Sequence, residues 1–289
     1  MSFPLLISIL FAFFFGIAAV VLSIRDDRKN KGERGIKAFP RYSAIEEEFV
    51  HMMVHELRAP LTSIKDSSEL LLAAGGQSLK EEEREQFLKI INRQSKALLI
   101  QISSILDAAK FESGTFQLDK KTEHIEDLIH ERIKIFEPQA EKKNITITSH
   151  TQRPIPRLYV DCLRINQVLN NLLSNSIKFT PPGGKIYIEI KAEGKNVEVS
   201  ISDTGVGIAR DLQDKIFSKF YQIKTKDRQE EKDGSGLGLY IVKKIIEAHN
   251  GKIWIESEQG KGTTVRFSLP IEPQKEEIKT ETAQYTVPN

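Results

Sequence analysis

The 289-residue sequence has little of several residue types on which common classes of site depend. Its single cysteine, Cys162, excludes an internal disulfide and a zinc site of several thiolates, and it suits a reducing compartment. Lys and Arg (42) nearly balance Asp and Glu (40), so we expect no direct nucleic acid binding. No G-x-x-x-x-G-K-[ST] sequence occurs, which excludes the commonest phosphate-binding loop. The hydrophobic share of 39% nonetheless suits globular domains, and the length allows about two.

One uncharged run, Phe3 to Ile24, lies at the start of the sequence. A helix of this length spans about 33 Å, enough for a hydrocarbon core of about 30 Å. The alternative is a cleaved signal peptide, but no basic residue precedes the run and it is longer than a usual signal core. The sequence therefore favours a transmembrane helix over residues 1–24, with residues 3–24 in contact with membrane lipid.

The segment after this run is basic, with seven Lys/Arg and three Asp/Glu between Arg25 and Arg41. Positive residues mark the cytoplasmic flank of a membrane helix and also attract anionic headgroups. A solvated linker is the other interpretation of the same charges. We expect a basic juxtamembrane linker over residues 25–44 in a single-pass protein of the inner or plasma membrane. Its N-terminus would lie outside and its catalytic part in the cytoplasm. Since only two residues precede the run, we expect no extracellular sensing domain.

Residues 45–114 predict two long helices. In the first, from Ile45 to about Ala74, apolar residues recur in steps of four and three as a heptad-like seam. Its members are Val50, Val54, Leu57, Leu61, Ile64 and Leu71, with Ser68 as a polar interruption. Gly75 and Gly76 then break the pattern.

The second helix is expected to start at a capping box of Ser78 and Glu81 and to end near Ser113 and Gly114. Its seam consists of Phe87, Ile91, Leu98, Ile105 and Ala108. A hairpin with one apolar face on each helix cannot bury itself. We therefore expect a homodimer in which two hairpins form a four-helix bundle.

Residues 115–270 alternate between predicted strands and helices, which indicates an α/β sandwich. The expected strands are 116–118, 144–149, 185–192, 196–203, 253–257 and 263–269. The expected helices are 125–142, 161–179, which Asp161 would cap, and 238–249. The charged, proline-containing tail, residues 271–289, is expected to be disordered.

His55 lies one position past the seam residue Val54, so its side chain is expected to face solvent. An exposed imidazole is a usable nucleophile. The adjacent Glu56 carboxylate can accept the proton on Nδ1, which leaves Nε2 free to attack. Two alternatives stay open: His51 and His55, at i and i+4, would suit a metal if a third ligand were present, and a surface histidine can lack any role.

The helix predicted over 161–179 aligns Asn171, Asn175 and Lys178 on its polar face. Amide oxygens beside a lysine suit a hydrated Mg²⁺ and the phosphates that it bridges. Asparagine is not favoured inside helices, so two on one face call for an explanation. A solvated helix face is the alternative interpretation.

Two glycine motifs follow. Asp203 ends a predicted strand, where its carboxylate can accept a hydrogen bond from an exocyclic amine, and Gly205 and Gly207 let the backbone approach a flat ring. Gly234-Ser-Gly236-Leu-Gly238 precedes a helix, whose N-terminus can hold phosphate oxygens. Between them, residues 209–233 contain aromatic and then charged residues, typical of a lid that closes over a ligand.

Together these motifs resemble the transmitter region of two-component sensor histidine kinases over about residues 45–270. The segments that carry the resemblance are FVHMMVHELRAPLTSI, NQVLNNLLSNSIKFT, SDTGVGI, IFSKFYQ and GSGLGLYIVKKIIEAHNG. The resemblance implies a HisKA-type phosphoacceptor hairpin and an ATP-binding domain of the GHKL (Bergerat) type. It implies an enzyme that transfers the γ-phosphoryl of ATP to its own histidine and then to an aspartate on the receiver domain of a response regulator.

Residue by residue, the resemblance implies that His55 is the phosphoacceptor and Glu56 its acid–base partner. Asn175 would hold Mg²⁺, with Asn171 beside it and Lys178 on a phosphate. The adenine site would consist of Asp203, Gly205, Gly207 and, through water, Thr263. The triphosphate would be bordered by Gly234, Gly236 and Gly238.

The sequence departs from the family in two places. Ala59 stands where the family has a Thr or Asn that orients water for dephosphorylating the regulator, so we expect weak or no phosphatase activity. Residues 25–48 are also too few for the usual relay module, so input is expected through the membrane helix, the juxtamembrane segment or a partner protein.

Two rival functions are a related ATPase, which would have Glu at the position of Asn171, and a membrane-tethered scaffold that binds nucleotide without catalysis. Asparagine cannot act as a general base, which disfavours the ATPase. Every catalytic position but Ala59 is filled, which disfavours the scaffold.

Overall fold

The computed structural model describes residues 44–73, 79–152, 154–223 and 235–271, with side chains on the first helix described from Val54 onward except for His55. The described residues from Glu48 onward belong to one compact unit. In these ranges no helix is both long and apolar enough to cross a bilayer, and the span predicted at residues 3–24 lies outside them.

Both long helices are present, as α2 (Ala44–Ala73) and α3 (Glu81–Glu112). The predicted capping box is wrong, because α3 begins at Glu81 with Lys80 as its N-cap. The Lys80 N–H donates to the Glu83 carboxylate at 3.1 Å. Three consecutive glutamates in the first turn favour this start, since negative charge stabilises a helix N-terminus. The helix ends as expected: Ser113 is the C-cap, and Gly114 takes a φ of +66°.

The hairpin leaves much apolar surface uncovered in the single chain. Leu61 on α2 is 57% exposed and Leu99 on α3 is 64% exposed. Further large apolar side chains exposed on these helices are Val54, Leu70, Leu72, Leu88, Ile100 and Leu106. This agrees with the expectation that the hairpin cannot bury its own apolar faces.

The strand predicted at residues 116–118 is wrong, because this segment packs through its side chains instead of pairing its backbone. The Phe116 ring stacks on Phe111 with 3.9 Å between ring centroids, and the Arg164 guanidinium lies 4.8 Å from the Phe116 centroid. The backbone N–H of Asp119 donates to the Asp161 carboxylate. Strand β1 comes later, at Lys121–Glu123, and pairs with β3 (Leu158–Val160), which the sequence pattern did not indicate.

The rest of the α/β domain follows the predicted order. Its helices are α4 (Ile125–Glu141), α5 (Cys162–Phe179), the short α6 (Arg210–Gln213) and α7 (Gly238–Ala248). Its longer strands are β2 (Thr146–Gln152), β4 (Lys185–Glu193), β5 (Asn196–Asp203), β6 (Lys252–Glu258) and β7 (Gly262–Pro270).

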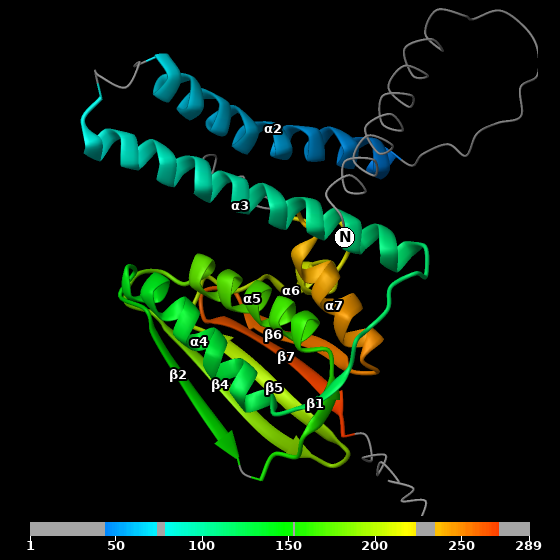
Figure 1. The fold of residues 1–289 in the computed structure, drawn as a ribbon. Coiled ribbons are helices and arrows are strands. Elements are labelled where there is room, and N and C mark those ends of the chain that lie inside the picture. Colours follow the sequence, from blue (N-terminus) through cyan, green and yellow to red (C-terminus); the bar gives the residue numbers. More distant parts are fainter. Residues whose placement is uncertain (1–43, 74–78, 153, 224–234, 272–289) are drawn as a thin grey trace, which may run out of the picture. The chain divides into compact units, whose positions relative to one another are not determined.

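These longer strands form a five-stranded sheet in the order β2-β4-β5-β7-β6. The β2–β4 pair is parallel and the others are antiparallel. Helices α4, α5 and α7 lie together on one face of this sheet (Figure 1). The core between helices and sheet contains fully buried residues such as Leu169, Ile188 and Ile245. Each such side chain contributes about 1.5–3 kcal/mol on burial, so the α/β domain has a core of its own.

Candidate functional site

The backbone of His55 lies within α2, as predicted, but its side chain lies outside the described residues, as does that of His51. Glu56 is half-buried and Ala59 is exposed. Pro60 lies inside the helix, where it removes one backbone donor. No group of three or more metal-ligating side chains occurs in the part of the chain that the structure describes, and the metal hypothesis for His51 and His55 rests on side chains outside that part.

The carboxylate of Asp203 is held at the end of β5 by three donors. Its Oδ1 accepts the N–H of Gly205 at 2.9 Å and the N–H of Thr263 at 3.3 Å, and its Oδ2 accepts the Ser176 hydroxyl at 3.3 Å. Sequence reasoning missed Ser176, because it lies on the predominantly apolar face of α5 and its partner Asp203 is 27 positions away in the sequence. The position and orientation of the Asp203 carboxylate are therefore set by β5, β7 and α5 together.

The environment of Asp203 also affects its protonation. Burial raises the pKa of the Asp203 carboxyl above its ordinary value, and the three hydrogen bonds oppose this rise. A half-buried carboxylate of this kind is a selective acceptor, because a ligand donor gains a hydrogen bond in a site with little competing water.

Thr263, predicted to support this site, lies directly opposite Asp203 in the β5–β7 register. Its hydroxyl shares a hydrogen bond of 2.9 Å with Ser257, whose hydroxyl also accepts the Ile208 N–H at 2.8 Å. Ser257 therefore connects β6 to the D-T-G-V-G-I loop. Only this cross-strand geometry identifies it, because nothing in its sequence context marks it.

The two glycines of that loop are required by close backbone approach. A Cβ on Gly205 would lie 2.6 Å from Asp203 Oδ1. Gly207 has a φ of +66°, and a Cβ there would overlap the carbonyl group of Glu258. A larger residue at Gly207 would displace the loop from the turn between β6 and β7, and one at Gly205 would also collide with the Phe179 carbonyl at the end of α5. The predicted shaping role of both glycines thus has a structural basis.

The predicted polar stripe on α5 is present. Asp161 caps the helix by accepting the Arg164 N–H at 3.1 Å, as expected. Asn171, Asn175 and Lys178 are all half-buried on the helix. The Asn171 amide donates to the Gln167 carbonyl at 2.9 Å, which leaves its Oδ1 directed away from its own helix turn. Amide oxygens are ligands that Mg²⁺ accepts, so this donor set fits the predicted metal and phosphate site.

The second glycine motif lies beside this stripe. A Cβ on Gly238, the first residue of α7, would lie 2.7 Å from Asn171 Oδ1. Gly236 has a φ of +65°, and a Cβ there would lie 2.7 Å from the Phe220 backbone, whose N–H donates to the Gly236 carbonyl. Gly234 lies outside the described residues. The structure thus brings the start of α7, Asn171 on α5 and the Phe220 segment together, a cradle that side chains at the glycines would fill.

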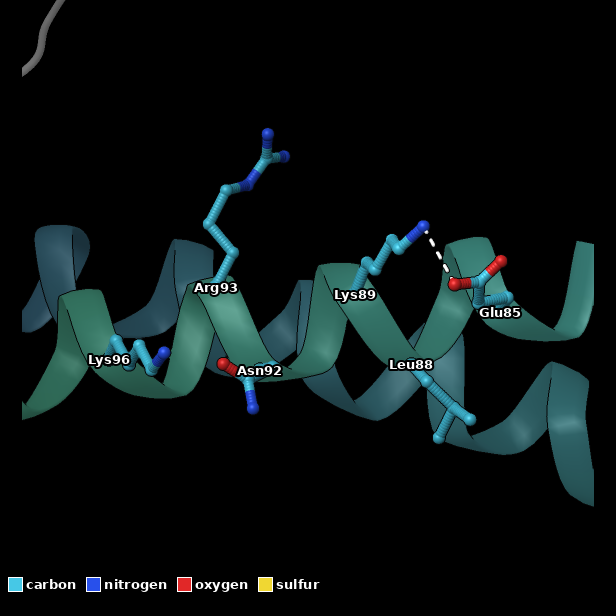
Figure 2. A pocket seen from close by; sticks show the side chains of 6 residues that line it. All are labelled: Glu85, Leu88, Lys89, Asn92, Arg93 and Lys96. Atoms are coloured by element: carbon cyan, nitrogen blue, oxygen red, sulfur yellow. Dashed lines mark ion pairs between the residues drawn. The ribbon is translucent and has the colours of Figure 1, made fainter. Parts of the chain in front are cut away.

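A shallow hollow also lies on α3, away from these residues (Figure 2). Lys89 and Arg93 point to one side of the helix, and Leu88 and Asn92 to the other (Figure 2). Lys89 pairs with Glu85 at 2.9 Å. The exposed Leu88 belongs to the uncovered apolar surface of the hairpin, and the hollow holds none of the predicted site residues.

Two family models match the chain. Residues 45–114 match the "His Kinase A (phospho-acceptor) domain", and residues 160–273 match the "Histidine kinase-, DNA gyrase B-, and HSP90-like ATPase". The first covers the α2–α3 hairpin and the second covers the domain that contains the cradle. The order of the two matches is the order that the sequence motifs predict.

The curated relatives that the chain resembles are also sensory kinases. The chain is 35% identical over 229 residues to the adaptive-response sensory kinase SasA of Synechocystis sp., covering 78% of this chain and 59% of the relative. It is 31% identical over 264 residues to the sensor histidine kinase WalK of Bacillus subtilis, covering 91% of this chain and 41% of the relative. The chain therefore spans about half the length of these curated relatives.

Solved structures share the fold. Full-length ShkA in complex with AMPPNP matches with a TM-score of 0.59 and 28% identity, over 78% of this chain and 45% of that one. The histidine kinase ThkA in complex with the response regulator protein TrrA matches with a TM-score of 0.56 and 29% identity, over 79% of this chain and 62% of that one. With a phosphoacceptor-type hairpin followed by an ATPase-type domain in the expected order, the chain belongs to the two-component sensor histidine kinases.

Proposed function

We propose that this protein phosphorylates itself on His55 with ATP and passes the phosphoryl group to an aspartate of a response regulator. The observation that supports this most strongly is the half-buried Asp203 carboxylate, fixed by Gly205, Thr263 and Ser176 beside a glycine-shaped loop. Such a carboxylate suits the exocyclic amine of adenine. Its Oδ1 already accepts two backbone donors, so Oδ2 is the atom proposed to accept from the base.

The phosphates are proposed to lie between α5 and the start of α7. Asn175 would hold Mg²⁺, which when bound neutralises phosphate charge, with Asn171 beside it, and Lys178 would contact a phosphate. The N–H groups at the start of α7 would donate to phosphate oxygens, since Gly236 and Gly238 leave room for close approach.

The chemistry is proposed for His55 and Glu56. Nε2 of His55 attacks the γ-phosphorus, a nitrogen–phosphorus bond forms, and the bond to the β–γ bridging oxygen breaks with its electron pair leaving on ADP. Glu56 accepts a hydrogen bond from Nδ1–H, which selects the reactive tautomer and stabilises the cationic ring that develops. In the second step an aspartate oxygen of the regulator attacks the same phosphorus and the histidine leaves.

Incubation of the full chain with γ-labelled ATP tests this proposal. We expect label on the protein that is acid-labile and base-stable, as for phosphohistidine, and no label on His55→Gln. His51→Gln is the matched control on the same helix and should retain the label. Label that persists in His55→Gln would exclude this phosphoacceptor. Nucleotide binding without any label would favour the scaffold function instead.

The proposed partner is a response regulator receiver domain. Support comes from the similarity to ThkA, whose structure is a complex with the response regulator protein TrrA. Transfer of label from the phosphorylated chain to purified regulators of the same cell tests this and identifies the cognate one. Because Ala59 has no hydrogen-bonding side chain, we propose that the protein dephosphorylates this regulator weakly or not at all.

We propose that the chain works as a homodimer anchored in a membrane. The exposed apolar side chains of α2 and α3, Leu61 and Leu99 among them, would be covered by a second hairpin in a four-helix bundle. The uncharged run at residues 3–24 and the basic segment after it support a single membrane span with the kinase domains in the cytoplasm. Deletion of residues 3–24 should move the protein from the carbonate-resistant membrane fraction to the supernatant. An unchanged distribution would contradict the anchor.

A further inference from the structure

Helix α3 carries a buried carboxylate that none of the proposed chemistry uses. Asp107 is only 5% exposed, and its Oδ2 accepts hydrogen bonds from Arg164 Nη1 at 2.7 Å and Gln167 Nε2 at 2.9 Å, both on α5. Arg164 also donates to the Gln167 side chain at 2.8 Å. The neighbouring Ala108 is only 4% exposed and belongs to the hydrophobic core. The last turns of α3 are thus joined to the helix that bears the Asn171 stripe.

A second carboxylate of α3 makes an equivalent contact one and a half turns later. Glu112 pairs with Lys219, whose ammonium lies 4.6 Å from the centre of the Phe220 ring. Phe220 has a φ of +67°, unusual for a residue with a side chain, and its N–H donates to the Gly236 carbonyl at 3.1 Å. Glu112 is therefore joined to the segment that packs against the second glycine motif.

Both cations belong to elements that border the proposed phosphate site. Arg164 lies two turns before Asn171 on α5, and Lys219 lies next to the residue that contacts Gly236. In the described structure each of these cations is paired with a carboxylate of α3. A triphosphate carries several negative charges, so these carboxylates repel it and neutralise two cations that would otherwise attract it.

Because the ion pair of Asp107 and Arg164 is largely buried, separating both partners together and hydrating them costs little free energy. A buried ion pair gains little net free energy, because desolvation of both charges offsets their attraction. Removing one partner alone leaves an unpaired buried charge, which is costly. The contact therefore has two favourable states, fully paired with α3 docked or fully hydrated with α3 released.

We propose that Asp107 and Glu112 form a latch that holds α3 on the α/β domain and competes with the phosphates of a bound nucleotide for Arg164 and Lys219. Nucleotide binding and docking of α3 then oppose each other, and by linkage each weakens the other by the same factor. This proposal rests on the proposed nucleotide-binding function. If it holds, binding of ATP would release the α/β domain from α3.

The test measures binding of AMPPNP with Mg²⁺, and separately of adenosine, to the full chain. Asp107→Asn, Glu112→Gln and the double variant should each bind AMPPNP more tightly, by about fivefold or more in the double variant. Adenosine has no phosphates, so its affinity should stay the same in all variants. Glu85→Gln, which removes another paired carboxylate of α3, is the matched control and should change neither affinity.

Hydrogen exchange provides an independent readout. AMPPNP with Mg²⁺ should speed amide exchange in residues 104–113 of the wild-type chain, and adenosine should not. Equal or weaker AMPPNP binding by Glu112→Gln and the double variant would overturn the latch, and so would a tighter binding of adenosine by the same factor. If the wild-type chain bound neither probe, the proposed nucleotide site itself would fail. Glu112 is 53% exposed, so its variant should fold even if Asp107→Asn does not.

Discussion

The α2–α3 hairpin and the α/β domain handle apolar surface in opposite ways. The domain encloses its core, with Leu169 and Ile188 almost inaccessible, whereas the hairpin leaves Leu61 and Leu99 more than half exposed. A unit with a closed core can fold and bind ligand by itself. A unit with uncovered apolar faces depends on another surface, which we propose to be a second hairpin. The proposed kinase thus combines a self-sufficient nucleotide domain with a phosphoacceptor region whose stability depends on assembly.

The largest expected effect is on the closed core. Leu169→Ala should lower the free energy of unfolding of the α/β domain by about 2–5 kcal/mol, because it leaves a cavity between α5 and the sheet. Urea denaturation followed by the single tryptophan, Trp254 on β6, measures this. Leu163→Ala on the same helix is the matched control, since Leu163 is 74% exposed and should cost little. If both variants lowered the free energy of unfolding equally, Leu169 would not be part of the core and Leu163 would not be on the surface.

The next largest effect is on ligand binding within the same domain. Asp203→Asn should weaken adenine nucleotide binding by about 100-fold, because the amide offers the base a weaker acceptor and the site loses its charge. Calorimetry with ADP measures the affinity, and Asp211→Asn on α6 is a control outside the hydrogen-bond network of Asp203. Subunit association should be unaffected, so a change in it would show that the substitution acts beyond the nucleotide site.

The raised pKa of Asp203 predicts a pH dependence with a definite sign. The folded state binds the Asp203 proton more tightly than the unfolded chain does. The free energy of unfolding should therefore fall as the pH rises through the pKa that Asp203 has in the folded state. Nucleotide affinity should change the other way and fall as pH drops, with its midpoint above the ordinary aspartate value of about 3.9. The Asp203→Asn variant should show neither dependence, and the same pH profile in that variant would assign the titration to another group.

A smaller effect is expected on the hairpin. Leu61→Ala should change the unfolding free energy of the α/β domain by less than about 0.5 kcal/mol but raise the dimer dissociation constant by about tenfold. Analytical ultracentrifugation of a detergent-solubilised chain measures the association. If Leu61→Ala left the dimer intact, the apolar face of α2 would have to be covered by something other than a second copy.

The smallest effect concerns Ala59, which is exposed on α2. Ala59→Thr should raise dephosphorylation of the phosphorylated regulator by a few-fold, since a hydroxyl can orient the attacking water. The autophosphorylation rate serves as the internal control and should stay within twofold. Rapid dephosphorylation by the wild-type chain would contradict the proposed weakness of this activity.

Patterns that repeat, or that have a side-chain partner nearby in sequence, were predictable. The Asp161 cap, the strands predicted at 185–192 and 196–203 and the two hairpin helices were confirmed for this reason. The failures concern short or non-local features. β3 has only three residues, all hydrophobic, so no alternation of polar and apolar residues marks it in the sequence. Residues 116–118 resembled a strand because apolar and polar residues alternate there, but the Phe116 ring packs on Phe111 and Arg164 and the segment pairs with no described strand.

The candidate site shows the same division. Asp203 and the glycines were identified because each occurs in a recognisable local motif. Ser176 and Ser257 were not, because their contacts with Asp203 and Thr263 join residues of different elements. The contacts of Asp107 could not be predicted from the sequence either, since Arg164 and Gln167 lie 57 and 60 positions away from it.

The sheet order has a consequence for biosynthesis. β7, the last strand among the described residues, lies between β5 and β6. The middle of the sheet is therefore completed only when residues 262–270 have emerged from the ribosome. Until then β5 and β6 each expose an unpaired edge, and Asp203 lacks its Thr263 donor. A message truncated shortly before this strand would therefore yield an aggregation-prone product without a nucleotide site, although it would still encode the entire phosphoacceptor hairpin.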